Sequence, residues 1–271
     1  MLYETISIYS RTLPLKRFAM TLDAVARTDP GPVRESNEDC FLVDIDTGLF
    51  IVADGMGGHA SGEIASAIAV ESVQEVLLGG INPDETRLDR SGMDEEEEIR
   101  ERLRYAMNQA SISIRKTAID NPVHTGMGTT LVVLLIENDE AHIGHVGDSR
   151  IYLFRDDRLL RLTRDHTVVQ QEIDAGTLTP ELARIVPHKN ILTQSVGYHG
   201  PVEPDTLTRP IEPGDLFILC SDGLTDPLDD EALAEICRNC EPEDLAEVLV
   251  QKAIENGTED NVTVVAVHIQ N

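Results

Sequence analysis

The pattern of apolar and polar positions divides the chain into short strands and a few longer helices. Short apolar or β-branched runs bounded by turn residues are typical of strands. They occur at residues 21–26, 41–43, 50–52, 129–136, 141–146, 150–154, 216–220 and 262–269. Apolar residues that recur three or four positions apart predict helices. This spacing is found over residues 60–78, 99–119, 229–238 and 243–256.

The order of these segments indicates the fold class. Strands are followed by two helices, more strands, two more helices and a final strand. Most strands are joined by short connections, whereas a parallel pair needs a crossover of about a dozen residues or more. We therefore predict an α+β fold in which a central antiparallel β-sandwich is flanked on both sides by pairs of helices.

Three segments do not fit the repeating pattern. Residues 1–20 are interpreted as an N-terminal extension to a single domain over 21–271, and an ordered segment, a disordered tail or a start codon placed too early all remain open. Residues 79–98, which end in the acidic run Asp94–Glu98, predict a solvated loop. Residues 165–200 contain prolines and glycines among mixed helical signals and predict a mobile flap.

Composition narrows the possible partners. A chain of 271 residues is compatible with one large domain, and its net charge of −27 argues against binding nucleic acid or anionic membranes. No apolar run is long enough to span a bilayer and no secretory signal is evident, so we expect a cytoplasmic protein. The pair Cys237 and Cys240 has zinc-knuckle spacing but no second pair, and we interpret it as two ordinary thiols at a helix end.

The candidate chemistry lies in acidic turns that are far apart in sequence. They occupy residues 34–39, 54–59, 147–150, 221–223 and 257–261. Asp54 and Asp222 each follow an apolar run, Asp260 precedes the last strand, and Asp148 is predicted at a hairpin between two strands. Each aspartate alone is a common turn residue. Together they predict converging carboxylates, which repel one another unless they share a hard cation such as Mg²⁺ or Mn²⁺.

Arg34 is the candidate phosphate ligand. It precedes Glu38 and Asp39 by a few residues. A guanidinium beside a carboxylate–metal centre suits bidentate binding of a phosphate group. Without these neighbours, Arg34 would be interpreted as an ordinary surface arginine.

The ordered motifs resemble those of a known family. They are Gly31-x-x-Arg34-x-x-Asn37-Glu38-Asp39, Val52-Ala53-Asp54-Gly55-Met56-Gly57-Gly58-His59, Met127-Gly128-Thr129-Thr130, His145-Val146-Gly147-Asp148-Ser149-Arg150, Leu162-Thr163-Arg164-Asp165-His166-Thr167, Leu192-Thr193-Gln194-Ser195-Val196-Gly197, Cys220-Ser221-Asp222-Gly223-Leu224-Thr225-Asp226 and Asp260-Asn261-Val262-Thr263. From about residue 21 to 269, the chain resembles the metal-dependent type 2C serine/threonine protein phosphatases in their compact bacterial form.

The resemblance implies a metal centre. The implied ligands are Glu38, Asp39, Asp54, Gly55, Asp148, Asp222 and Asp260. Asp54 would bridge two Mn²⁺ or Mg²⁺ ions. Asp222 and Asp260 would complete one ion's ligands and the Gly55 carbonyl the other's, while Glu38 and Asp39 would contribute directly or through water. Asp148, together with Asp222, would hold a third and weaker ion.

The resemblance also implies a reaction. A hydroxide bridging the two ions would attack the phosphorus of phosphoserine or phosphothreonine in a protein, and Arg34 would hold the phosphate and stabilise its charge. The implied catalytic residues are Arg34, Asp54 and His59. Some relatives carry a histidine directly after the Asp-Gly pair, but here Met56 has that position, so the general acid is either His59 or a water. The implied partners are phosphorylated proteins and a Ser/Thr kinase, and we expect a monomer.

Other classes fit less well. No cysteine has an arginine six residues later, which excludes a cysteine phosphatase. Residues 41–48 approach the haloacid-dehalogenase pattern, but Gly48 has the place of the required threonine. A pseudophosphatase that binds phosphoproteins without turnover usually lacks one of the metal-binding aspartates, and this chain keeps Asp54, Asp222 and Asp260. A narrow regulatory phosphatase acting on an anti-sigma-factor antagonist shares the chemistry, but no attached sensor or ATPase domain is visible.

Overall fold

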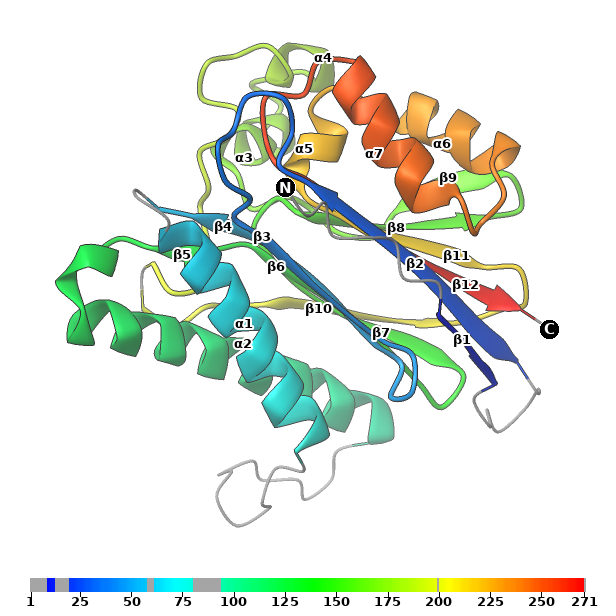
Figure 1. Ribbon diagram of the computed structural model, residues 1–271, viewed down its shortest axis with the longest axis horizontal. Helices are drawn as coiled ribbons and strands as arrows, with labels where there is room; N and C mark the ends of the chain where they lie inside the picture. The colour runs from blue at the N-terminus through cyan, green and yellow to red at the C-terminus, as the bar shows by residue number, and fades with distance from the viewer. Residues whose placement is uncertain (1–8, 13–19, 58–60, 80–93, 199, 271) are drawn as a thin grey trace.

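The protein is a sandwich of two antiparallel sheets with helices on both outer faces (Figure 1). The computed structural model describes residues 9–12, 20–57, 61–79, 94–198 and 200–270. Every strand pair among them is antiparallel. Helices α1 and α2 cover one sheet, and α6 and α7 cover the other. The predicted α+β sandwich is therefore confirmed.

The two sheets draw on strands from distant parts of the chain. The first has the order β1 (Tyr9–Thr12), β2 (Thr21–Asp29), β12 (Val262–Gln270), β11 (Leu216–Cys220), β8 (Arg150–Arg155) and β9 (Arg158–Arg161). The second has the order β10 (Asp205–Pro210), β7 (Glu140–Val146), β6 (Leu131–Glu137), β4 (Leu49–Met56) and β3 (Asp39–Asp44), with β5 (Gly128–Thr129) paired to β4. Part of the N-terminal extension, strand β1, thus pairs with β2.

The core explains why the central strands read as continuous apolar runs. In β4, Phe50 and Val52 face the opposite sheet, while Leu49, Ile51 and Ala53 face α1 and α2. Both faces of β4 are therefore covered, and all five residues are fully buried. A strand covered on one face only would alternate apolar and polar residues. Burial of residues 49–53 on both faces fixes the position of the next residue of β4, Asp54.

Two pairs of helices cover the sandwich. Helix α1 (Ser61–Leu78) packs against α2 (Glu95–Asp120) on the second sheet. On the first sheet, the short α5 (Asp222–Thr225) precedes α6 (Asp230–Asn239) and α7 (Leu245–Glu255). Cys237 and Cys240 lie at the end of α6 as free thiols. No helix in the part of the chain that the structure describes is both long and apolar enough to cross a membrane.

The prediction that Asp94–Glu98 belongs to a loop is wrong. Asp94 is the N-cap of α2, and its side chain accepts a hydrogen bond from the backbone N–H of Glu97 at 2.9 Å. The following glutamates form the first helical turn. Negative side chains are favoured there because the free N–H groups and the helix dipole present positive charge. The part of the predicted connector at residues 80–93 lies outside the described residues.

The predicted hairpin at Asp148 is also wrong. Strand β7 belongs to the second sheet and β8 to the first, so Gly147–Ser149 crosses between the sheets. Gly147 has φ of +107°, and an added Cβ would lie 2.7 Å from the Cβ of Thr130. Only glycine fits such a crowded left-handed position without strain. The crossing places Asp148 at the edge of the sandwich, where residues of both sheets can reach it.

Several short elements were not predicted. These are β5, β9, β10, α5 and the 3₁₀ turn Pro122–His124. Strand β10 has the sequence Asp-Thr-Leu-Thr-Arg-Pro, whose single strongly apolar residue gives no strand signal. It forms because its backbone completes the edge of the second sheet beside β7. The flap segment contains α3 (Val168–Asp174) and α4 (Pro180–Ala183).

Candidate metal centre

A cavity of about 800 Å³ collects the acidic turns that are far apart in sequence. The predicted site residues that line it are Arg34, Glu38, Asp54, Gly55, Asp148, Asp222 and Asp260. Asp54 comes from β4 of the second sheet, whereas Asp222 and Asp260 flank β11 and β12 of the first. Both sheets and the flap therefore contribute to its walls. His59 lies outside the described residues.

Asp39 stands behind the cavity and links the two sheets. It lies directly opposite Asp54 in the β3–β4 register. Its Oδ2 accepts hydrogen bonds from Ser221 Oγ at 2.8 Å and Thr263 Oγ1 at 2.6 Å, whereas its Oδ1 is buried without a partner. Burial raises the pKa of Asp39 to about 6, although the two hydroxyls oppose that rise. One carboxylate oxygen is thus anchored and the other is left for a ligand.

The Asp54 backbone is held firmly, so its carboxylate has a defined origin. Its N–H donates to Thr130 Oγ1 at 3.0 Å, and its carbonyl accepts from the Thr130 N–H and the Thr129 hydroxyl, both at 2.8 Å. The strand continues through Gly55 and Met56 because both pair with β5. Asp54 therefore lies within β4 and not in the turn that was predicted over residues 54–59.

The carboxylates converge closely enough to perturb one another. Burial raises the pKa of Asp54 well above its usual value, and the negative charge of Asp39 and Asp222 raises it further. Burial and the charge of Asp148 likewise raise the pKa of Asp222. The pKa of Asp148 rises to about 7, first from burial and then from the charge of Asp165. Such mutual repulsion favours a bound cation, because a positive charge between the carboxylates would offset it.

Close backbone contacts hold the Asp222 and Asp260 turns in position. An added Cβ on Gly223 would lie 2.0 Å from the carbonyl oxygen of Asn261, and one on Gly31 would lie 2.3 Å from that of Asp260. Glycine at these positions allows the three loops to touch. The loops that carry Arg34, Asp222 and Asp260 therefore form one packed unit.

Arg34 reaches into this unit from the surface. Its guanidinium donates to Asp260 Oδ2 at 2.7 Å, and its side chain is 53% exposed. The ion pair orients the guanidinium toward the carboxylates and leaves other N–H groups at the mouth of the cavity. Burial raises the pKa of nearby Glu38, with Arg34 opposing the rise.

Asn261 is a positioning residue that the sequence reasoning missed. Its Oδ1 accepts from the Glu38 N–H at 2.8 Å, and its Nδ2 donates to the carbonyls of Pro30 at 3.0 Å and Ser36 at 2.9 Å. One side chain thus ties the Arg34–Asp39 segment to the Asp260 turn. The only available signal was its place directly after Asp260.

The donor set fits a hard divalent cation. Asp39 Oδ1 and Asp222 Oδ1 are buried oxygens without hydrogen-bond partners, and buried polar atoms are seldom left in this state. The other candidate donors are carboxylates and the Gly55 carbonyl. Oxygen donors of this kind favour Mg²⁺ and Mn²⁺ over softer ions.

In a second group of possible ligands, hydrogen bonding accounts for two of the three residues, His166 and Asp205. Donor atoms of His145, His166 and Asp205 lie within 4.8 Å of one another. However, His166 Nδ1 accepts from the Gly147 N–H at 3.2 Å, which places the ring proton on Nε2, facing Asp205 Oδ2 at 3.3 Å. A protonated nitrogen cannot bind a metal. Burial lowers the pKa of His145 to about 4, so that ring is neutral.

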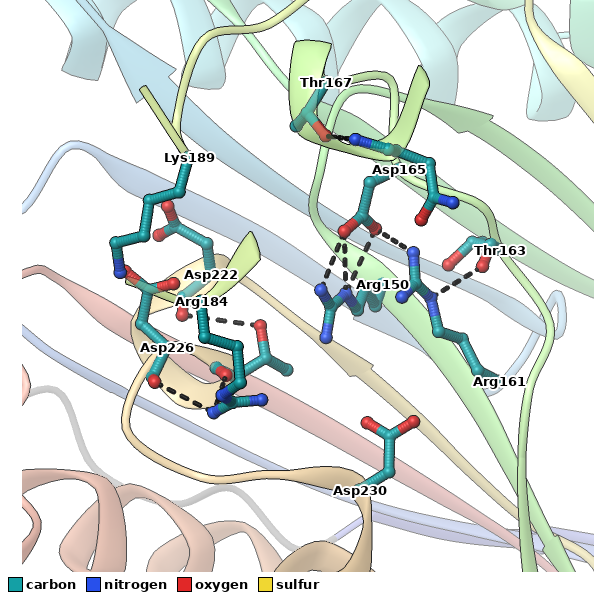
Figure 2. A network of polar contacts seen from close by, with 12 residues as sticks. Arg150, Arg161, Thr163, Asp165, Thr167, Arg184, Lys189, Asp222, Asp226 and Asp230 are labelled. Atoms are coloured by element: carbon teal, nitrogen blue, oxygen red, sulfur yellow. Dashed lines mark hydrogen bonds and ion pairs between the residues drawn. The ribbon is translucent and has the colours of Figure 1, made fainter. Parts of the chain in front are cut away.

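Polar contacts connect the flap to β8, β9 and the segment that follows Asp222 (Figure 2). At its base, Asp165 accepts from the Arg150 guanidinium, with a closest distance of 2.7 Å, and pairs with Arg161. Farther along, Lys189 Nζ pairs with Asp226 at 2.6 Å. These residues surround a second cavity of about 390 Å³, which shares Asp148 and Asp222 with the first. The flap therefore packs directly against the site.

Comparison with known proteins identifies the family to which the chain belongs. The sequence model of the protein phosphatase 2C family matches residues 33–252. The chain belongs to this family.

Individual relatives agree with this assignment. The chain is 36% identical over 255 residues to the serine/threonine protein phosphatase PstP of Mycobacterium tuberculosis, covering 94% of this chain but only 46% of PstP. It is 37% identical over 250 residues to the serine/threonine phosphatase stp of Listeria monocytogenes, covering 91% of this chain and 95% of that protein. The crystal structure of the PstP catalytic domain with two manganese ions superposes with a TM-score of 0.79 at 34% identity, covering 93% of this chain and 100% of that one.

Proposed function

We propose that this protein hydrolyses phosphoserine and phosphothreonine in other proteins and so reverses the action of a Ser/Thr kinase. The observation that carries the proposal is the convergence of Asp54, Asp222 and Asp260 on one cavity with Arg34 at its mouth. The relatives named serine/threonine phosphatases support it. A monomer acting on phosphoproteins is part of the same proposal.

We assign the ion ligands residue by residue. Asp54 would bridge two Mn²⁺ or Mg²⁺ ions, with Asp222 and Asp260 on one and the Gly55 carbonyl on the other. Glu38 and Asp39 would bind directly or through water, and Asp148 with Asp222 would hold a third ion. When bound, these cations supply positive charge that makes water available as hydroxide near neutral pH and stabilises the phosphoryl oxygens.

The chain's own residues prepare the site for this chemistry. Ser221 and Thr263 hold one oxygen of Asp39 and so fix the direction of the other. Thr130 and Thr129 fix the backbone of Asp54. Preorganised charge of this kind stabilises a transition state because little has to move when the reaction occurs. The Arg34 guanidinium is placed to donate hydrogen bonds to the substrate phosphate.

Replacing Arg34 by alanine is expected to raise KM for a phosphothreonine peptide about tenfold or more, since a charge-assisted hydrogen bond contributes about 1.5–3 kcal/mol. Arg34→Lys should recover part of the loss, because lysine keeps the charge but not the paired N–H groups. Steady-state kinetics and inhibition by inorganic phosphate would measure both effects. Calorimetric Mn²⁺ binding is the control, and an unchanged KM in Arg34→Ala would remove Arg34 from phosphate binding.

The proposed function is tested by hydrolysis of a phosphothreonine peptide by the full chain. Phosphate release should stop in EDTA and return when Mn²⁺ or Mg²⁺ is added. Calorimetry on the same sample would report ion binding separately. Tight Mn²⁺ binding without any turnover would reject the enzyme and favour a module that only binds phosphoproteins.

A further inference from the structure

One wall of the cavity of about 800 Å³ contains none of the proposed metal ligands. Met56, Tyr198 and Val202 line it together with the acidic residue Glu203. Two further grooves each share lining residues with this cavity but none with each other. One groove contains Arg34 and Asp260, and the other, of about 430 Å³, contains Val202 and Glu203. The wall therefore lies along a path that leaves the site away from Arg34.

The apolar part of this wall is built on a glycine. An added Cβ on Gly128 would lie 3.2 Å from the Cβ of Tyr198 and 3.5 Å from the Cε of Met56. The absence of a side chain at Gly128 lets Tyr198 and Met56 lie next to each other. Tyr198 is nevertheless 49% exposed.

Glu203 supplies charge at the end of the apolar surface. Its backbone N–H donates to Gln194 Oε1 at 3.1 Å, which ties its backbone to the cavity rim. It is exposed, and no lysine, arginine or histidine of the described residues forms an ion pair with its carboxylate. Glu203 lines both the metal cavity and the adjoining groove.

A long basic side chain matches this combination. Arginine and lysine have apolar stems and charged heads, and a guanidinium binds both an aromatic face and a carboxylate. An acidic substrate residue would be repelled by Glu203 and by the protein's net charge of −27. An apolar residue would pack on Met56 and Tyr198 but would gain nothing from Glu203.

We propose that Met56, Tyr198 and Glu203 form a specificity subsite for an arginine close to the phosphorylated residue of the substrate. The proposal rests on the proposed phosphatase function and names a feature of its substrates. Three residues of extended chain span about 10 Å, so three positions on each side of the phosphorylated residue are scanned for this arginine. Its stem would lie on Met56 and Tyr198, and its guanidinium would reach Glu203.

The test uses phosphothreonine peptides that differ at one position. Arginine, alanine, leucine and glutamate are placed in turn at each of the three positions before and after the phosphothreonine, and kcat/KM is measured with Mn²⁺. At one position, arginine should exceed alanine about fivefold, mostly through KM, as expected for an exposed cation–π contact with an ion pair. Glutamate should be the poorest residue at that position.

Two variants test whether the preference for arginine depends on the residues of the proposed subsite. Glu203→Gln and Tyr198→Leu should each remove most of the arginine advantage while leaving hydrolysis of p-nitrophenyl phosphate unchanged. Glu243→Gln is the matched control, because it removes the same charge from an exposed loop residue that lines neither groove.

The outcomes separate the two proposals. Equal rates for all peptides, a preference for leucine, or an arginine advantage that survives in Glu203→Gln would overturn the subsite. A loss of p-nitrophenyl phosphate hydrolysis in Glu203→Gln would overturn it as well, because Glu203 would then serve the reaction itself. Failure of the unaltered protein to hydrolyse any phosphorylated compound would instead reject the proposed function.

Discussion

Replacement of Asp54 by asparagine is expected to reduce kcat for a phosphothreonine peptide about a thousandfold and, at the same time, to stabilise the metal-free protein. A ligand proposed to bridge two ions affects both of them, and a loss of about 4 kcal/mol of transition-state stabilisation corresponds to that factor. Stability should change in the opposite direction because the carboxylate of Asp54 is buried among Asp39, Asp148 and Asp222. Asparagine has nearly the same shape without the charge.

Thermal unfolding with EDTA and with Mn²⁺ would measure the change in stability caused by Asp54→Asn. In EDTA, Asp54→Asn should unfold at a higher temperature than the unaltered protein, and Mn²⁺ should stabilise it less. Asp156→Asn is a suitable control, since Asp156 is an exposed turn residue with φ of +51°, which asparagine adopts readily. If Asp54→Asn were less stable in EDTA, the repulsion inferred between these carboxylates would not exist.

The metal-free protein is also expected to lose stability as the pH rises from about 4 to 7, and bound Mn²⁺ should abolish much of this loss. The folded pKa is about 6 for Asp39 and about 7 for Asp148, both above their ordinary values. A carboxyl group whose pKa is raised by folding binds its proton more tightly in the folded state. Its stabilising contribution is therefore complete below the unfolded pKa and is lost as the pH rises through the folded pKa.

The expected loss in the free energy of unfolding is large enough to measure. A shift from the ordinary value of 3.8 to about 7 for Asp148 corresponds to about 4 kcal/mol at 1.36 kcal/mol per unit. Urea unfolding in EDTA across this range, with Asp148→Asn for comparison, would isolate the contribution. His145, whose pKa is lowered to about 4, acts in the opposite direction below its unfolded pKa, but it is present in both proteins. If the two proteins showed parallel pH curves, Asp148 would have an ordinary folded pKa.

The sequence was sufficient to locate a residue where its position depends on its neighbours in the chain. The run Leu49–Ala53 is apolar on both faces, and this marked β4 and the aspartate that follows it. Asp222 and Asp260 were found for the same reason, since each adjoins an apolar strand. The structure adds the register of β3 and β4, which places Asp39 directly opposite Asp54.

The sequence was insufficient where a role depends on contacts between distant segments. The crossing at Asp148 joins two sheets, and no local pattern distinguishes it from a hairpin turn. Strand β10 exists only because β7 offers it an edge. The hydroxyl of Ser221 matters because it reaches Asp39, 182 residues earlier in the chain. Such contacts are decided by packing, which single-residue preferences do not encode.

Because both sheets contribute to the site, the site is complete only after the last described strand has been synthesised. Strand β12 comes last in the described chain, yet it occupies an interior position of the first sheet between β2 and β11. Thr263 within it anchors Asp39, and Asp260 just before it completes the proposed ligands. A chain interrupted before Asp260 would lack both groups and an interior strand of the first sheet. We therefore expect such a truncated product to have an incomplete site.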